Sequence, residues 1–154
     1  MTLLDADVLV IDNRDKDDRK EVNRQFLDSV LHSEQPFGIL IQPLLETVGV
    51  LSYGSKPSRI RLLPVILCMK YRLSVIPDPV RYPEYAYCTF AELVDQMTKK
   101  MSLGDAVQAV QIEKYAPDAK ALVTWNAKHF DQKICVPVLT PAEWLAAHPA
   151  AAQS

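Results

Sequence analysis

Short apolar runs alternate with stretches of helical periodicity along the whole chain. Five runs have the length and composition of strands: residues 3–11, 37–41, 73–76, 121–125 and 136–139. The first run is apolar on both faces except at Asp5 and Asp7, which is typical of a central strand covered by helices on both sides. Pro137 cannot donate a ladder hydrogen bond, so we expect the last run at an edge of the sheet.

The segments between these runs have the apolar spacing of helices. Such spacing begins near Lys20, Leu44, Thr89 and Ser102. Residues 89–92 and 140–143 have the pattern of capping boxes, and the first of these helices is expected to run to about Met101. Pro57 fits the first turn of a helix, whereas Pro64 is expected to kink or end it. Residues 77–87 are rich in proline and tyrosine and are expected to form a loop.

This alternation predicts an α/β fold with three layers, α/β/α, around a mainly parallel central sheet of about five strands. The chain has 154 residues, of which 49% are apolar and 23% charged, which is the composition of one globular domain. We expect a single domain over residues 1–148 and a frayed tail over residues 149–154. The net charge of −2 excludes a protein that coats duplex nucleic acid by charge alone.

The spacing of the cysteines and the length of the apolar runs indicate the cellular compartment in which the protein is expected. Cys68, Cys88 and Cys135 form no C-x-x-C pair, which argues against a disulfide framework or a zinc ribbon and fits a reducing compartment. The first residues carry carboxylates where a secretory signal is basic and apolar. The longest apolar run, residues 62–69, is too short to cross a membrane. We therefore expect a soluble, cytoplasmic protein with no membrane partner.

Three acidic residues lie in apolar surroundings that their sequence neighbours do not neutralise: Asp5, Glu46 and Asp105. Ligands of an open parallel sheet bind beyond the carboxyl ends of the strands, and we expect these acids to meet there. Asp5 and Asp7 are expected on one face of the first strand, because strand side chains alternate with a period of two. Burying such charges costs several kcal/mol unless a partner or a metal ion compensates them.

A divalent cation would provide that compensation. An all-oxygen set of ligands suits Mg²⁺ or Mn²⁺ better than Zn²⁺. Such an ion lowers the pKa of its bound water and positions a phosphodiester for in-line attack. Structural interpretations stay open, because Asp105 can complete a capping box with Ser102, Glu46 can be a partly exposed helix residue, and Asp7 can pair with an arginine.

Five segments resemble the motifs of PIN domains in the order of that family. They are Leu3–Leu9, Leu44–Val48 around Glu46, Ser102–Val107 around Asp105, Leu122–Phe130, and Val138–Leu145. The resemblance covers roughly residues 3–145. It implies a Mg²⁺- or Mn²⁺-dependent endoribonuclease, most often the VapC-like toxin of a toxin–antitoxin pair. It also implies an RNA substrate, an antitoxin partner and a homodimer, but it does not indicate which residues bind RNA.

The resemblance also implies roles for individual residues. Asp5, Glu46, Asp105 and Asn126 would be catalytic, with Asp5 and Asp105 as direct metal ligands and Asp7 and Thr124 around them. Two positions depart from the family pattern, because Asp7 stands where the family usually has Asn, and Asn126 stands where many members have a fourth acid. His129 and Trp125 are expected to be surface or packing residues.

Two other functions remain open. Asp5-Ala6-Asp7 resembles the Asp-x-Asp motif of haloacid-dehalogenase-like phosphatases, in which Asp5 would be the nucleophile, although Val8 and Leu9 depart from the Gly and Thr that normally follow. The chain could instead be a PIN fold kept as a catalytically weakened module that binds RNA or protein.

Overall fold

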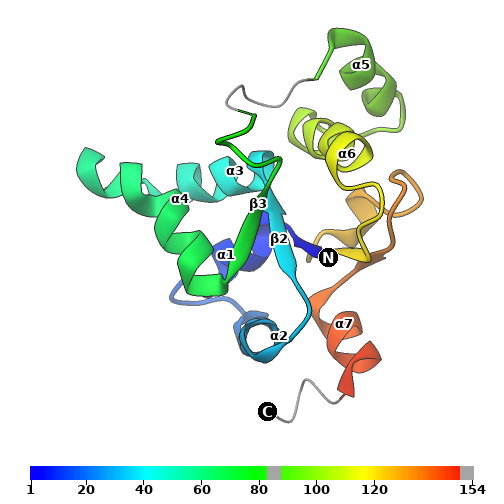
Figure 1. Cartoon of the computed structure of the whole chain (residues 1–154). Coiled ribbons are helices and arrows are strands. Elements are labelled where there is room, and N and C mark those ends of the chain that lie inside the picture. Colours follow the sequence, from blue (N-terminus) through cyan, green and yellow to red (C-terminus); the bar gives the residue numbers. More distant parts are fainter. Residues whose placement is uncertain (83–87, 150–154) are drawn as a thin grey trace.

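A parallel sheet of five strands forms the centre of the protein (Figure 1). The structure is a computed structural model that describes residues 1–82 and 88–149. The strands are β1 (Thr2–Leu4), β2 (Phe37–Leu40), β3 (Leu73–Ile76), β4 (Ala121–Val123) and β5 (Val138–Leu139). Their order is β3-β2-β1-β4-β5 and every pairing is parallel. The predicted parallel α/β sheet is confirmed, as is the place of β5 at an edge.

Helices connect the strands. They are α1 (Ala6–Asp12), α2 (Lys20–His32), α3 (Ile41–Leu51), α4 (Pro57–Tyr71), α5 (Phe90–Thr98), α6 (Leu103–Tyr115) and α7 (Pro141–Ala147), with a 3-10 turn, η1 (Ala127–His129), after β4. The capping boxes predicted at Thr89 and Thr140 are both present, with each threonine side chain and its partner glutamate bonded reciprocally. None of the described helices is both long and apolar enough to cross a membrane.

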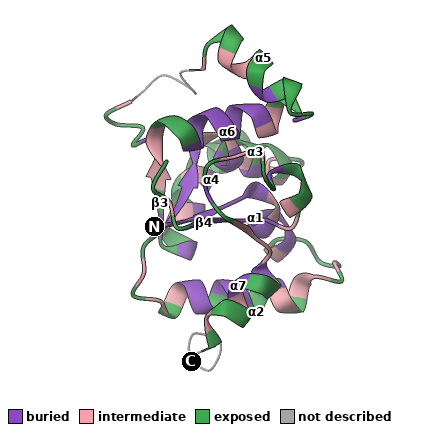
Figure 2. Cartoon of the chain, turned by 90° about the vertical axis from the view of Figure 1, so that its right-hand side faces the viewer, coloured by how far each residue is buried: buried purple, intermediate pink, exposed green. Residues whose placement is uncertain are grey.

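Two apolar clusters fill the spaces between the sheet and the helices. Leu4 of β1 belongs to the cluster that packs against α1, α2, α4 and α7, which includes Phe26 and Trp144. Leu3 belongs to the opposite cluster, which packs against α6. Figure 2 shows α6 largely buried, with the more exposed α5 beyond it. Successive residues of β1 thus face different cores, which confirms the predicted three layers.

The strand predicted over residues 3–11 is wrong beyond Leu4. Asp5 has extended backbone angles and caps α1, accepting a hydrogen bond on Oδ1 from the N–H of Ala6 at 2.7 Å. The four consecutive residues Val8 to Ile11 of this short helix are all buried, so the helix has no exposed face over this turn. A run that is apolar on both faces fits a buried helix as well as a central strand, and the capping aspartate decides between them. Asp5 and Asp7 therefore do not share a strand face.

The expected interruption of a helix at Pro64 is also wrong. Helix α4 continues through Pro64 to Tyr71, although proline removes one helical hydrogen bond. Leu63, Leu67 and Tyr71 are buried at four-residue intervals on either side of the proline, and their packing holds the helix together. Helix α5 ends at Thr98, earlier than expected. The expected loop lies outside the described residues at 83–87, and the expected tail does so from residue 150 onward.

Candidate active site

The candidate site lies where the direction of strand addition reverses. The chain passes from β1 to β2 and β3 on one side and returns to β4 and β5 on the other, so β1 and β4 are neighbours in the sheet. Asp5 directly follows β1 and Thr124 directly follows β4. The N–H of Asp5 donates to the carbonyl of Val123 at 3.0 Å. The carboxyl ends of strands at such a reversal are the usual ligand site of open parallel sheets.

Asp5 is the most buried acid at this position. It is 7% exposed, and its Oδ2 accepts a hydrogen bond from Thr124 Oγ1 at 2.7 Å. Burial raises the pKa of the Asp5 carboxyl above its usual value, and the nearby charge of Asp105 adds to this rise. The hydrogen bonds from Thr124 and Ala6 oppose the rise without cancelling it.

Asp7 lies one residue into α1 and turns back toward the same threonine. Its Oδ2 lies 3.1 Å from Thr124 Oγ1 and accepts a hydrogen bond from the N–H of Trp125 at 2.9 Å. Its other oxygen, Oδ1, is buried without a hydrogen-bond partner among the described residues. Burial, followed by the charge of Asp5, raises the pKa of Asp7 to about 7.

Helices α6 and α3 bring the other two predicted acids into the same electrostatic environment. The N–H of Asp105 donates to Ser102 Oγ at 3.2 Å, so Asp105 sits in the first turn of α6. Glu46 is exposed on α3, yet partial desolvation and the charges of Asp5 and Asp105 raise the pKa of its carboxyl. The charges of Asp5 and Asp105 also repel each other. The three mutually repelling acids therefore come from the cap of α1, from α3 and from the first turn of α6.

These acids lack direct lysine or arginine partners in the described chain. Within residues 1–82 and 88–149, no lysine or arginine forms an ion pair with Asp5, Asp7, Glu46 or Asp105. The ion-pair partner of Asp105 is His129, whose Nδ1 lies 3.4 Å from Asp105 Oδ2 and which is charged only when protonated. The sequence therefore correctly indicated acids without lysine or arginine partners, although it placed Asp5 and Asp7 on the wrong element.

The donor set fits a hydrated metal ion better than an enclosed one. In the part of the chain that the structure describes, no three Asp, Glu, His or Cys side chains are grouped closely enough to hold a metal ion. Mg²⁺ commonly keeps several water molecules and binds proteins through one or two carboxylates. Repelling carboxylates with raised pKa values and the unpartnered Oδ1 of Asp7 suit an ion of this kind.

The remaining predicted residue, Asn126, contacts the site through its backbone. Its N–H donates to Thr124 Oγ1 at 3.0 Å, while the residue as a whole is exposed and its side chain does not cap η1. Thr124 is fully buried and joins this backbone to both aspartates. Thr124 is thus more closely connected to the acids than Asn126 is.

Two residues near the acids were missed from the sequence. His129 was expected to be a surface or packing residue, but it contacts Asp105. Gln108 is 2% exposed, and its amide is close enough to Asp5 to lower the pKa of that carboxyl, while its Nε2 has no hydrogen bond of good geometry. Gln108 lies three residues after Asp105 on the same side of an otherwise apolar stretch, and that spacing was the available signal.

Comparison with known proteins supports the fold. No family model matches the sequence, and no curated protein matches it. Among solved structures, a chain in the crystal structure of VapBC2 from Rickettsia felis bound to a DNA fragment from their promoter has a similar fold, with a TM-score of 0.57. The match covers 90% of this chain and 97% of that chain at 20% sequence identity. This likeness agrees with the PIN-like architecture that the sequence motifs implied.

Proposed function

We propose that this chain is a metal-dependent endoribonuclease of the VapC type and the toxin of a toxin–antitoxin pair. The observation that carries the proposal is the grouping of Asp5, Asp7, Glu46 and Asp105 near the strand reversal, with raised pKa values for the first three. Among the described residues, His129 is the one basic side chain that forms an ion pair with any of the four. The PIN motifs in the sequence and the fold shared with a chain of the VapBC2 complex support the same proposal.

Asp5 and Asp105 would hold a Mg²⁺ or Mn²⁺ ion. When bound, the ion would supply a water of lowered pKa and would offset charge on the phosphodiester. Thr124 fixes the direction of the Asp5 carboxylate through its hydroxyl. Glu46 is exposed and has a raised pKa, so it would be the group that accepts a proton from the attacking water. Asp7 would remain a buried neighbour whose carboxyl, with a pKa of about 7, has to lose its proton before it adds negative charge to the site.

An apolar surface on α3 and α4 supports a protein partner. Exposed apolar side chains gather on α3 and α4, at Leu45, Leu62, Val65, Ile66 and Met69. A groove of about 550 Å³ runs between these helices and β3. Helix α4 projects from the body of the molecule (Figure 1). Surfaces of this kind commonly mark protein interfaces, so the antitoxin and the homodimer remain proposed partners of this chain.

The direct test is cleavage of single-stranded RNA by the purified chain with Mg²⁺, with Mn²⁺ and with EDTA. We expect cleavage only with a metal ion and loss of cleavage in Asp5→Asn and Asp105→Asn. Asp95→Asn, which removes an exposed carboxylate from α5, is the matched control and should retain full activity. Cleavage that survives EDTA or both site substitutions would contradict the proposal.

The same preparation separates the other candidate functions. Release of phosphate from a phosphomonoester, together with phosphorylation of Asp5, would identify a phosphatase instead. RNA binding without turnover would identify a binding module. Size-exclusion chromatography with light scattering would measure whether the chain forms the expected homodimer.

A further inference from the structure

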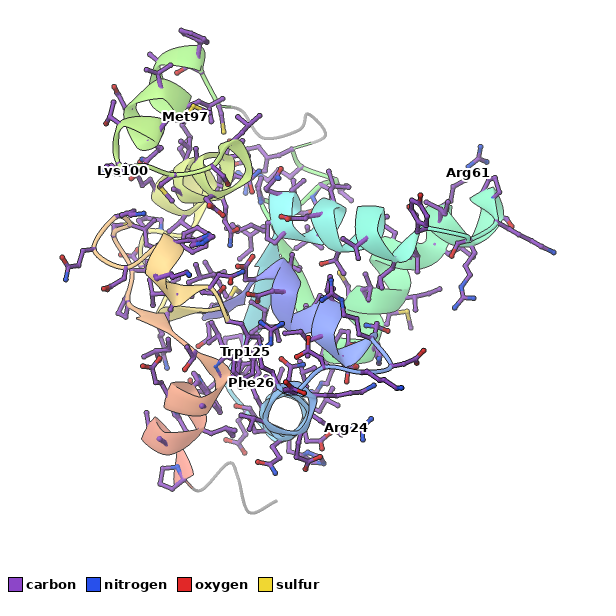
Figure 3. All side chains as sticks on the ribbon, turned by 180° about the vertical axis from the view of Figure 1, so that it is seen from behind. Arg24, Phe26, Arg61, Met97, Lys100 and Trp125 are labelled. Carbon is purple, nitrogen blue, oxygen red and sulfur yellow. The ribbon has the colours of Figure 1, made fainter. Side chains whose placement is uncertain are left out.

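An arginine–tryptophan pair borders the acids. Trp125 directly follows Thr124, and its backbone N–H donates to Asp7 Oδ2 at 2.9 Å. The indole Nε1 donates to Asn23 Oδ1 on α2 at 2.8 Å, which fixes the ring between α2 and the end of β4 (Figure 3). The Arg19 guanidinium carbon lies 5.7 Å from the centre of the indole ring, within the range of a cation–π contact.

Asp17 holds the guanidinium of Arg19 in one orientation. Arg19 Nε and Nη2 each donate to a different oxygen of Asp17, at 2.9 Å in both cases. This paired contact occupies one of the two edges through which a guanidinium binds a phosphate in a bidentate way. The Arg19 side chain is nevertheless 41% exposed. Asp17 thus engages Nε and Nη2, and a ligand would meet the exposed remainder of the guanidinium.

RNA bases stack on aromatic rings and on the planes of arginine guanidinium groups. We infer that the guanidinium of Arg19, supported from behind by Trp125, is a stacking subsite for one nucleobase of a single-stranded RNA substrate. The inference rests on the proposed function, since it takes RNA as the substrate. The backbone of Trp125 bonds Asp7, and the charge of Asp7 acts on Arg19, so the stacked base would belong to a nucleotide near the phosphate that is cleaved.

The surrounding charges favour stacking over phosphate binding at this position. Asp17, Asp18 and Asp7 all act on the charge of Arg19, so these carboxylates already offset part of its attraction for a phosphate. Stacking of an uncharged base does not depend on that attraction. Trp125 packs against the core cluster, as the sequence predicted, and it therefore supports the subsite without receiving the base itself.

The test compares Arg19→Lys, Arg19→Ala and the unaltered chain in binding a fluorescein-labelled 12-nucleotide single-stranded RNA in EDTA, by fluorescence anisotropy. Lysine keeps the charge but has no plane on which a base can stack. We expect both variants to bind about tenfold more weakly, the size of one base–side-chain stack. Lys16→Ala removes a charge of the same sign from the same exposed segment and should bind within about twofold of the unaltered chain.

A second measurement locates the stacked base. A series of RNAs is used, each with one abasic site at a different position. The unaltered chain should bind one of them about tenfold more weakly than the intact RNA. The Arg19→Lys variant should bind that RNA and the intact RNA equally well, because it has no stack to lose. Arg19 makes no side-chain cap to α2, so these variants should fold normally, as circular dichroism would verify. Equal binding by Arg19→Lys and the unaltered chain, absence of a sensitive position, or absence of RNA binding would overturn the inference.

These results can be told apart from failure of the proposed nuclease. Binding is measured without metal, so a stacking effect in a chain that never cleaves RNA would refute the nuclease and keep the subsite. Metal-dependent cleavage with an unaffected Arg19→Lys variant would refute the subsite and keep the nuclease.

Discussion

The hydroxyl of Thr124 lies between two carboxylates, with Oγ1 at 2.7 Å from Asp5 Oδ2 and at 3.1 Å from Asp7 Oδ2. A hydroxyl has one proton and can donate to only one of them at a time. The second carboxylate must then repel the hydroxyl oxygen or carry a proton of its own. The raised pKa values of Asp5 and Asp7 agree with a shared site of this kind.

Replacing Thr124 with valine keeps the shape of the side chain and removes this donor. We expect Thr124→Val to raise the pKa of both aspartates further and to weaken Mn²⁺ binding about tenfold, the size of effect known for residues that orient metal ligands. Isothermal titration calorimetry with Mn²⁺ measures this directly. Thr98→Val, on the distant helix α5, is the matched control. Unchanged affinity in Thr124→Val would show that the hydroxyl does not orient Asp5.

Asp5→Asn should separate stability from activity. Asparagine caps a helix as well as aspartate does, so α1 keeps its start. The substitution also removes a buried charge whose raised pKa shows that its surroundings disfavour ionisation. We expect the metal-free variant to unfold at a higher temperature, by about 2–4 °C for each kcal/mol gained, while RNA cleavage is lost. A variant that is inactive and also less stable than the unaltered chain would contradict a mainly functional role for Asp5.

The stability of the metal-free protein should fall as the pH rises. The carboxyl of Asp7 has a pKa of about 7 in the folded protein, against the ordinary value of 3.8 for an aspartate. Between these values the folded protein keeps a proton that the unfolded chain has released, so the free energy of unfolding decreases with increasing pH. For one such group the decrease is up to about 1.4 kcal/mol per pH unit.

Urea unfolding in EDTA at about pH 5 and about pH 7 measures this decrease. Asp7→Asn should remove much of the difference between the two conditions, and Asp95→Asn should leave it unchanged. Metal affinity should change in the opposite direction and increase with pH, because the carboxylates must lose their protons to bind an ion. An equally large pH difference in Asp7→Asn would assign the effect to other groups.

A hydrogen-bond network distant from the acids offers a test of stability alone. Tyr71 Oη donates to Asp12 Oδ2 at 2.6 Å and accepts hydrogen bonds from Lys70 Nζ at 2.7 Å and Asn13 Nδ2 at 3.1 Å. This network joins the ends of α1 and α4. We expect Tyr71→Phe to lower the free energy of unfolding by about 1–3 kcal/mol and to leave RNA cleavage intact. Tyr53→Phe, at a side chain that is 97% exposed, should change neither quantity.

Much of the fold could be predicted because local signals and burial agreed. The capping pairs after Thr89 and Thr140 and the β-branched run before Pro77 each formed the expected element. Residues 5–11 could not be assigned from periodicity, because a short helix buried on all sides has no polar face. Pro64 was misjudged because the packing of Leu63, Leu67 and Tyr71, which lies in the tertiary structure, outweighs the local cost of proline.

The sequence indicated the acids of the candidate site and, through the family resemblance, Asp7 and Thr124 near them, but it did not indicate the contacts among these residues. Asp5, Glu46 and Asp105 stood out because charged residues are costly in apolar segments. The hydroxyl of Thr124 shared by two aspartates, the contact of His129 with Asp105, and the plane of Arg19 over Trp125 depend on how distant segments pack. No local pattern in the sequence encodes those relationships.

The pairing of β1 with β4 has a consequence for synthesis of the protein. Asp5 and Thr124 are 119 positions apart, and β4 must take its place beside β1 before they can meet. A nascent chain still on the ribosome lacks that neighbour until most of its length has emerged. If the chain is a ribonuclease, the ribosome and messenger that produce it are therefore exposed to its activity only after β4 has emerged and paired with β1.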